Sequence, residues 1–201
     1  MEKLAPAQCP IEGLLSRRWS PRAFASRPVE HEKLRQLFEA ARWAASSYNE
    51  QPWIYLVATH ENPAEFQKML SCLIDFNQSW AKAAPVLAIS LARTRLSQNG
   101  EPNRHAHHDV GAASTTLAIQ AVALGLAVHQ MAGFDAARVR QTYKVPDDCD
   151  PMAAMAIGYH GDPDGLPDKL REREMSPRSR RPTSEFVFSG SWGSPAPFTS
   201  H

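Results

Sequence analysis

Two segments in the first quarter of the sequence carry side chains suited to binding a small phosphorylated ligand. In Arg18-Trp19-Ser20-Pro21-Arg22-Ala23-Phe24, two guanidiniums flank a serine. The planar guanidinium fork can donate two parallel hydrogen bonds to phosphate oxygens. In Ser46-Ser47-Tyr48-Asn49-Glu50-Gln51-Pro52-Trp53, serine, asparagine and glutamine stand just before an apolar run. Such neutral groups suit the edge of a polar, uncharged ring, so the two segments together predict a phosphorylated heterocycle as the ligand.

Basic residues form two concentrations that are far apart in the sequence. The first contains Arg17, Arg18 and Arg22, and the second contains Arg171, Arg173, Arg178, Arg180 and Arg181. Two such groups could converge on one phosphate, although surface arginines are more often simply solvated. The residues alone leave both interpretations open.

The bulk composition is that of an ordinary globular protein. The chain has 201 residues, 43% of them hydrophobic and 21% charged, with a formal net charge of +1. This length suits one domain with a sizeable core, and the composition argues against disorder. A nearly neutral chain lacks the concentrated basic field that nucleic acids and acidic membranes attract, so we predict neither as a partner.

The cysteines and the apolar runs indicate the cellular compartment. Cys9, Cys72 and Cys149 are odd in number and lack CxxC spacing, which argues against a disulfide framework or a zinc ribbon and fits a reducing compartment. Residues 1–6 contain no apolar signal core, and no apolar run reaches membrane-spanning length. We therefore predict a cytoplasmic protein.

Hydrophobic periodicity predicts helices that alternate with short strands. Compact apolar runs predict three buried strands, at residues 53–58, 85–91 and 152–159. Amphipathic spacing predicts helices near residue 10, over about 28–45, from residue 62, and over 138–143. The polar segment 94–103 is expected to be a loop.

The longest helical signal covers residues 108–128, which are rich in alanine, lack proline and are apolar nearly all round. Such a helix is either central in a core or buried between subunits. Residues 162–178 are expected to form a charged surface excursion, and residues 181–188 an extended segment. Together these elements predict one α+β domain over residues 1–201, with a small central sheet, a dominant buried helix and a flexible tail over about 190–201.

Five segments resemble, in the same order, the motifs of one protein family. Arg18 to Phe24 is similar to an Arg-x-Ser-x-Arg-x-Phe motif, and Ser46 to Trp53 to the more specific Ser-Ser-x-Asn-x-Gln-Pro-Trp motif. The other three are Asp109-Val110-Gly111 through Gly125-Leu126, Ala156-Ile157-Gly158-Tyr159 and Arg178-Ser179-Arg180-Arg181-Pro182. By these motifs the chain resembles the nitroreductase family of FMN-dependent oxidoreductases over most of its length.

The resemblance implies an α+β fold with a small mixed or antiparallel sheet surrounded by helices. It also implies an intertwined homodimer with two FMN sites at the interface, each built from both chains. The implied reaction passes a hydride from NADH or NADPH through FMN to a small organic acceptor, such as a nitroaromatic compound or a quinone, by a ping-pong mechanism. Because the cofactor carries the hydride, no catalytic side chain is expected.

The family's phosphate-side contacts map onto the two basic motifs. Arg18 and Ser20 take the positions that contact the phosphate and the ribityl chain, and Arg178 and Arg180 those that complete the phosphate clamp. Arg22 takes the position of a cation near the ribityl chain and the pyrimidine side of the flavin, where positive charge stabilises the reduced form.

Trp19 stands where a polar residue is commoner in the family. It is therefore expected to contact the cofactor through its backbone, if at all.

The ring-side contacts map onto three other places. Ser46, Ser47 and Asn49 are expected to line the flavin of the partner subunit, although serine and asparagine here would also suit an ordinary turn. Asn77 takes the place of an asparagine near the pyrimidine edge.

The segment after the long helix supplies the last expected contacts. Backbone amides of Met131, Ala132 and Gly133 are expected near the reactive nitrogen of the flavin, where small residues permit close approach. Ala132 replaces the usual acidic residue.

Other functions were weighed against this one. His105, His107, His108 and Asp109 could suggest a metal site, but helical ligand pairs prefer a spacing of three or four, and the adjacent His107 and His108 would point in different directions. The cluster also lies at a loop-to-helix junction, where polar residues are expected, so we predict no metal and favour the active-site entrance or surface charge. The alternatives are a family branch with different flavin chemistry, such as dehalogenation or flavin cleavage, and a non-catalytic interaction protein. Neither GxxxxGK[ST] nor GxGxxG is present, which argues against a P-loop or Rossmann enzyme.

Overall fold

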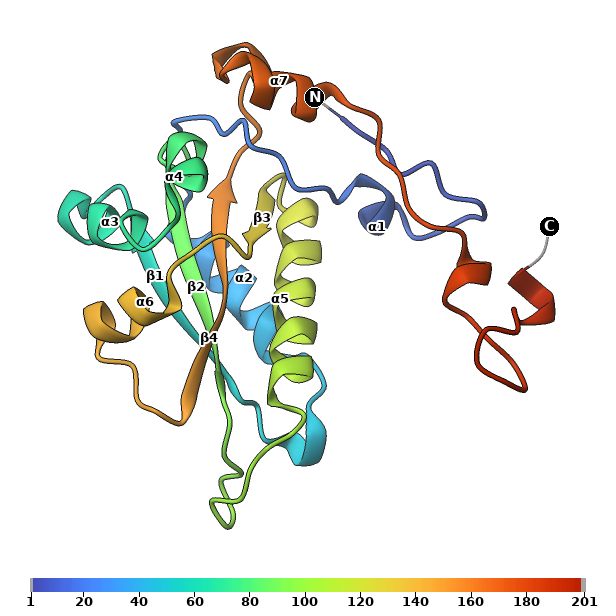
Figure 1. Cartoon of the computed structure of the whole chain (residues 1–201). Helices are drawn as coiled ribbons and strands as arrows, with labels where there is room; N and C mark the ends of the chain where they lie inside the picture. Colours follow the sequence, from blue (N-terminus) through green and yellow to red (C-terminus); the bar gives the residue numbers. More distant parts are fainter. Residues whose placement is uncertain (1, 200–201) are drawn as a thin grey trace.

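The computed structural model describes residues 2–199 and is organised around one antiparallel sheet (Figure 1). The four strands lie in the order β1-β2-β4-β3. They are β1 (Trp53–Thr59), β2 (Val86–Arg93), β3 (Ala127–Met131) and β4 (Cys149–Gly158). Every neighbouring pair is antiparallel. The predicted α+β class is confirmed, and the sheet is antiparallel throughout.

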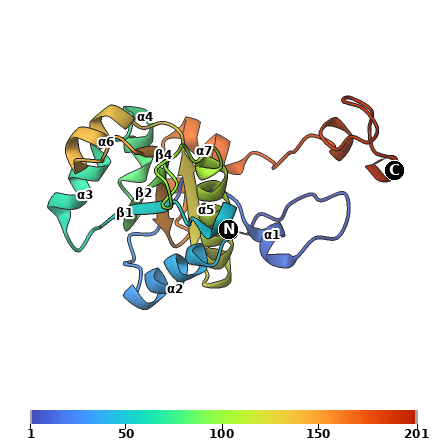
Figure 2. The same cartoon turned by 90° about the horizontal axis from the view of Figure 1, so that it is seen from below.

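Helices cover both faces of the sheet (Figure 2). One face packs against α2 (His31–Arg42) and α5 (Ala106–Ala123), and the other against α3 (Pro63–Leu70), α4 (Asp75–Ala81) and α6 (Ala136–Tyr143). The central strand β2 shows how the sequence produces this arrangement. Val86 and Ala88 contribute to the core on the α2 and α5 side, whereas Leu87 and Ile89 contribute to the core on the other side. Side chains alternate between the faces of a strand, so a strand covered on both faces is apolar at every position.

The predicted long helix is shorter than expected, because its last residues belong to a strand. α5 ends at Ala123, and β3, a strand that was not among the three predicted, begins four residues later. Gly125 has a φ of +73°, and the Leu126 amide donates to the Ala121 carbonyl at 2.8 Å, as in a glycine-terminated helix end. The apolar pattern continues unbroken across this turn, which is why periodicity alone did not separate helix from strand.

α5 is buried along one face only. Its buried residues include Val110, Ala113, Leu117 and Ala121, which face α2 and the sheet. On the opposite side, Gly111, Thr115 and Ala123 are exposed in this single chain. The expected buried helix is therefore present, but its other face is exposed to solvent in the single chain.

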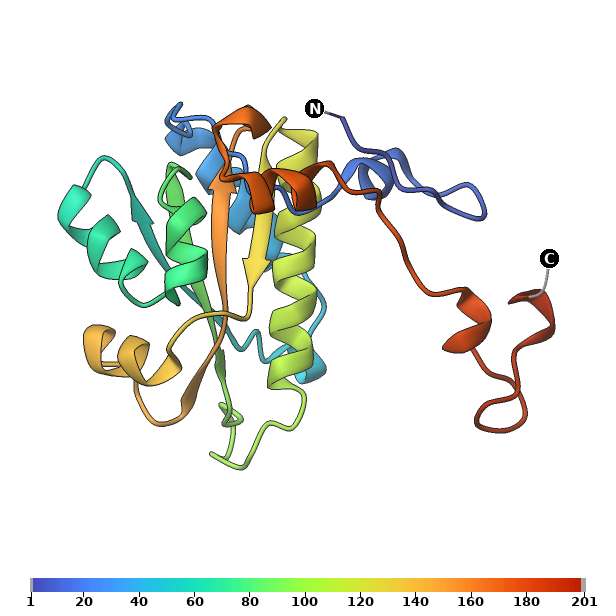
Figure 3. The same ribbon diagram turned by 45° about the horizontal axis from the view of Figure 1, so that its top comes forward.

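Three helices, α4, η2 (Pro163–Gly165) and α7 (Asp168–Met175), lie in segments for which no helix was predicted. α4 follows α3 directly, and the segment 162–178 contains the short helix η2 and α7. α7 is very polar and buries only Leu170 and Glu174, so it has no apolar stripe to reveal it. Figure 3 shows α7, in orange, crossing the end of the sheet near β3 and β4.

The two ends of the described chain extend away from the sheet on the same side (Figures 1 and 3). The N-terminal arm, residues 2–17, includes α1 (Gly13–Arg17), and the C-terminal arm, residues 176–199, includes η3 (Thr183–Glu185) and η4 (Pro197–Thr199). The segment predicted to be extended at 181–188 therefore contains a helical turn. Large apolar side chains are exposed on both arms, namely Leu4, Ile11, Leu15, Phe186, Trp192 and Phe198.

The predicted flexible tail at 190–201 stays a prediction, and residues 200 and 201 lie outside the described residues. None of the helices within residues 2–199 combines the length and the apolar character needed to cross a bilayer.

Candidate functional site

Residues 18–23, which we call the arginine segment, are held in place by side chains from three distant parts of the chain. Arg178 donates from Nη2 to the Arg18 carbonyl at 2.9 Å. His129, on β3, lies with Nδ1 2.8 Å from the Pro21 carbonyl. Glu174, on α7, accepts from the Arg22 amide at 2.8 Å and the Ala23 amide at 3.1 Å. Backbone bonds add to these contacts, since the Ala23 carbonyl accepts from the Gly161 amide at 2.9 Å and the Arg18 amide donates to the Leu14 carbonyl at 3.0 Å. Together they satisfy backbone groups of the segment and fix its course.

Three arginines from the two ends of the chain form a cluster of positive charge around this segment. Burial and the charge of Arg180 lower the pKa of Arg18. Burial and the charges of Arg18 and Arg180 lower the pKa of Arg178. Among residues 2–199, none of the three forms a salt bridge with a carboxylate. Like charges held together without a counter-ion are costly, which favours binding of an anion at this place.

Within this cluster, Arg178 binds backbone carbonyls. Arg178 Nη1 donates to the carbonyls of Lys3 at 2.7 Å and Ser16 at 2.6 Å, in addition to the bond from Nη2 to Arg18. Both terminal nitrogens of Arg178 are thus engaged with backbone. Arg178 therefore braces the two arms and the arginine segment with three of its five N–H donors, and its direct contact with a phosphate stays a prediction.

Arg18 and Arg180 keep donors for a ligand. Arg18 lies with Nη1 3.4 Å from the hydroxyl of Ser20, so the predicted phosphate pair is adjacent in space. Arg180 is exposed, and its recorded bond is a local one, from Nη1 to the Ser179 carbonyl at 2.7 Å. The two residues are close enough for the charge of Arg180 to act on Arg18.

The side chain of Trp19 has a structural contact that the sequence did not indicate. Its ring stacks on His160 with ring centroids 5.4 Å apart and an interplanar angle of 19°. The Nζ of Lys3 lies 5.0 Å from the Trp19 ring centroid, in a cation–π contact. The indole therefore anchors the arginine segment and the N-terminal arm, which leaves its backbone as the part available to a cofactor.

Arg22 is only partly satisfied by its neighbours. Its Nη1 lies 3.9 Å from Oε2 of Glu174. Its Nε is buried and has no hydrogen-bond partner within residues 2–199. Burial lowers the pKa of Arg22, and the carboxylate of Glu174 opposes this. Buried donors in folded proteins usually have an acceptor, so this Nε is consistent with a ligand that supplies the missing acceptor.

His129 was not predicted as a site residue. It lies on β3 between Val128 and Gln130, and its ring packs on Trp80 with centroids 4.6 Å apart. Because no strand was predicted at this place, nothing in the sequence pointed to this histidine. Its bond to Pro21 places an imidazole directly behind the arginine segment.

The lowered pKa of His129 predicts a pH-dependent stability. Burial, with the charges of Arg22 and Arg18, lowers this pKa to about 4. The stabilising contribution of the neutral ring is complete above the unfolded pKa near 6.5 and is lost as the pH falls through about 4. His129→Gln is therefore expected to remove about 3 kcal/mol of the decrease in unfolding free energy between pH 7 and pH 4.

Urea unfolding of the apoprotein at a series of pH values measures this difference. His31→Gln, at an exposed position on α2, is the matched control and should follow the wild type. Parallel curves for the wild type and His129→Gln would show that the folded state does not disfavour the protonated ring.

The predicted ring-side residues Asn77 and Gly133 are in contact. Asn77 is 7% exposed, and its Nδ2 donates to the Gly133 carbonyl at 2.9 Å. A Cβ on Gly133 would lie 2.5 Å from Asn77 Nδ2, so only glycine fits without displacing the amide. Ala132 is exposed, whereas the side chain of Met131 is buried in the core. Met131 can therefore contact a ligand only through its backbone.

The predicted contacts Ser46, Ser47 and Asn49 lie in a strained turn. Residues 47–49 form the short helix η1, in which Tyr48 and Asn49 have φ values of 52° and 57°, and Gln51 follows with 48°. Left-handed non-glycine residues cost energy and are held by their surroundings. Here the Ser47 amide donates to Asp109 at 3.0 Å and the Gln51 amide to the Ser46 hydroxyl at 3.0 Å. Strain of this kind gathers at functional sites.

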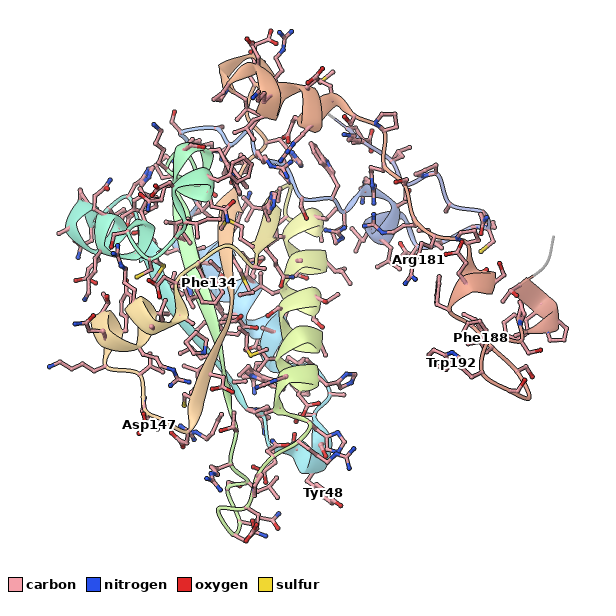
Figure 4. The ribbon with its side chains drawn as sticks, in the orientation of Figure 1. Tyr48, Phe134, Asp147, Arg181, Phe188 and Trp192 are labelled. Carbon is pink, nitrogen blue, oxygen red and sulfur yellow. The ribbon has the colours of Figure 1, made fainter. Side chains whose placement is uncertain are left out.

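Within one chain, this turn and the arginine segment lie at opposite ends of α5. Ser47 bonds to Asp109 in the first turn of α5, and Figure 4 shows Tyr48 projecting from this end. Arg17 and Trp19 instead share a pocket with Val122 and Gly125 at the other end. Thirteen residues of helix separate Asp109 from Val122, which corresponds to about 20 Å. The structure therefore does not bring the two predicted halves of the site together in a single chain.

The segment 94–105 borders the strained turn. Both oxygens of Glu50 bind Ser97, accepting from its amide at 2.8 Å and its hydroxyl at 3.2 Å. Of the nearby histidines, His107 pairs with Asp150 at 3.0 Å, and Asp150 also binds Arg140 at 2.7 Å. Within residues 2–199, no three His, Cys, Asp or Glu side chains gather in a way that could hold a metal ion.

Comparisons with known proteins agree with this arrangement of motifs. A model of the nitroreductase family matches residues 15–159. A solved structure described as an oxidoreductase containing FMN is 36% identical, covers 92% of this chain and 94% of its own, and superposes with a TM-score of 0.88.

Two curated proteins match at lower coverage. An uncharacterized 15.4 kDa protein of Mycolicibacterium smegmatis is 37% identical over 129 residues, which is 63% of this chain and 84% of that protein. A protein of Streptomyces coelicolor named "Putative NADH dehydrogenase/NAD(P)H nitroreductase" is 29% identical over 178 residues, 76% of this chain and 86% of that protein. With the family model matched over most of its length and the family's motifs gathered in its fold, this chain belongs to the nitroreductase family.

Proposed function

We propose that the protein is an FMN-dependent oxidoreductase that takes a hydride from NADH or NADPH and passes it to a small organic acceptor. The observation that carries this proposal is the group of three arginines beside Ser20, namely Arg18, Arg178 and Arg180, which have no carboxylate partner among residues 2–199. A phosphate monoester is the anion that such a group of forked donors suits best. The FMN described in the solved structure that is 36% identical carries such a phosphate.

The residues present fit FMN. Arg18, Ser20 and Arg180 would hold the phosphate, with Arg178 bracing them, and the partnerless Nε of Arg22 marks unfinished hydrogen bonding on the ribityl and pyrimidine side. Asn77 and the backbone of residues 131–133 would meet the ring edge. When bound, FMN supplies the two-electron chemistry, so the protein's task is to place it and to set its electrostatic surroundings.

We further propose that the protein is a homodimer with the FMN sites at its interface. The turn at Ser46 to Asn49 and the arginine segment lie about 20 Å apart along α5 within one chain, too far to share one ring system. A two-fold partner can place its own turn beside the arginine segment. The open face of α5 and the exposed apolar residues of both arms, such as Trp192 and Phe198, are consistent with an extensive contact of this kind.

The assignments of the hydride donor and the acceptor rest on the name of one relative and on one residue of this chain. The name of the Streptomyces coelicolor relative supports a nicotinamide nucleotide as the donor. Ala132 stands where the family commonly has an acidic residue, which favours an acceptor that needs no partner charge there. We propose a cytoplasmic location, in keeping with free cysteines at all three positions.

The direct experiment is an anaerobic titration of the FMN-loaded protein with NADH and, separately, with NADPH. We expect bleaching of the flavin absorbance by at least one nucleotide, followed by reoxidation when a quinone or a nitroaromatic compound is added. Flavin that stays oxidised with both nucleotides would overturn the assigned donor. Purified protein that takes up no FMN would overturn the oxidoreductase assignment itself and leave the non-catalytic alternative.

A further inference from the structure

Glu174 is a buried carboxylate that contacts the arginine segment but is not part of any motif. It lies on α7 and is 1% exposed. Its Oε1 accepts from the amides of Arg22 and Ala23, and its Oε2 lies 3.0 Å from the Arg22 amide. The same Oε2 lies 3.9 Å from Nη1 of Arg22. One side chain thus contacts both the backbone and the guanidinium of a single residue.

The backbone bonds alone do not account for a carboxylate at this position. Two amide donors need acceptors, and an uncharged amide oxygen could serve them at a smaller desolvation cost than a buried charge. The negative charge matters only where a cation is near, and Arg22 is the cation whose side chain it faces. The two other charged groups around them are Arg173, whose charge lowers the pKa of Arg22, and Lys3, whose Nζ binds the Glu174 carbonyl at 2.6 Å.

We propose that Glu174 is a positioning residue that fixes Arg22 beside the cofactor and moderates the positive charge that Arg22 presents to it. The proposal rests on the FMN site proposed above. Positive charge on the pyrimidine side of FMN favours its reduced form. A carboxylate behind Arg22 weakens that effect, so Glu174 sets the reduction potential through Arg22 and, through the backbone bonds, keeps the arginine segment in place.

The test compares Glu174→Gln, which keeps shape and an acceptor but removes the charge, with Glu174→Ala, which removes both. For Glu174→Gln we expect FMN affinity within about threefold of the wild type and reduced FMN bound about tenfold more tightly relative to oxidised FMN. That ratio is a rise of about 30 mV in the midpoint potential of a two-electron couple. For Glu174→Ala we expect at least a tenfold loss of FMN affinity.

The matched control is Glu172→Gln, an exposed position on the same helix, which should change neither quantity. In an Arg22→Gln background, Glu174→Gln should no longer shift the potential, because the residue through which it acts is gone. An unchanged potential in Glu174→Gln, or the same shift in both backgrounds, would overturn the proposal.

Glu174→Asp provides a second route if Glu174→Gln does not fold. The shorter carboxylate keeps the charge but loosens the bonds to the Arg22 and Ala23 amides. We expect about a tenfold loss of FMN affinity with an unchanged potential, and full affinity would refute the positioning role. Wild-type protein that binds no FMN is detected before any variant is compared, and it would remove the proposed function together with this inference.

Discussion

Arg18→Ala is expected to weaken FMN binding by about 10- to 100-fold and to leave riboflavin binding nearly unchanged. The substitution removes charge-assisted hydrogen bonds to the phosphate, each worth about 1.5–3 kcal/mol. Arg18 is half-buried and belongs to a cluster whose other charged members are also arginines, so water cannot easily replace it. Arg180→Ala should act in the same direction, with a smaller effect because Arg180 is exposed.

Fluorescence titration with FMN and with riboflavin measures both affinities, since flavin emission changes on binding. Arg17→Ala is the matched control, because Arg17 is an exposed arginine one residue away that has no place in the proposed phosphate clamp. Arg18→Lys should recover part of the affinity by restoring charge without the fork. If Arg18→Ala and Arg180→Ala both bind FMN like the wild type, the phosphate clamp is wrong. An equal loss of FMN and riboflavin affinity in Arg18→Ala would indicate general damage to the segment instead.

A mixture of two defective chains is expected to regain FMN binding that neither chain has alone. One chain carries Arg18→Ala with Arg180→Ala, and the other carries Asn49→Asp, which tolerates the left-handed backbone at position 49 but adds a negative charge. If each site takes its arginine segment from one subunit and its turn from the other, a mixed dimer has one site with both wild-type halves. The other site then carries both defects, so about one FMN per mixed dimer is expected.

The measurement needs two different affinity tags and sequential purification, so that only mixed dimers are assayed for bound flavin. Homodimers of each variant provide the baselines. A site contained within one chain predicts a different outcome, because every chain in the mixed dimer would then hold a defective site. Mixed dimers with no more FMN than the two homodimers would therefore contradict the shared site.

The elements that could be predicted are those whose ends are marked by local residues, such as helix caps, prolines or a change from apolar to polar residues. β1 and β2 are apolar and β-branched runs, and α3 starts with Asn62 accepting from the Glu65 amide and Pro63 at the first position. β3 was missed because apolar residues run from α5 through the turn at Gly125 without a polar break. α7 was missed for the opposite reason, since it has almost no apolar residues to reveal a period.

The site could be predicted only in part, because its supports lie far away in the sequence. Arg18, Ser20 and Arg22 stand out through their spacing, and Asn77 through its place before the second strand. Glu174 lies in a run of charged residues and His129 in a strand that was not predicted, and nothing local assigns either to the arginine segment. Arg178 has the residue type that a phosphate requires, yet the structure uses its donors for three backbone carbonyls. Residue type showed the chemistry, but only the fold shows which donors are engaged.

The bracing of the arginine segment has a consequence for how the protein is made. The bonds from Glu174 and Arg178 join residues that are 151 to 175 positions apart in the chain. A ribosome releases residues 18–23 about 150 residues before it releases Glu174 and Arg178. Contacts of such high sequence separation also form late because their loop-closure entropy must be met first. The arginine segment therefore reaches its final course after the four strands have been synthesised, and a ligand that needs this segment can bind only once Glu174 and Arg178 are in place.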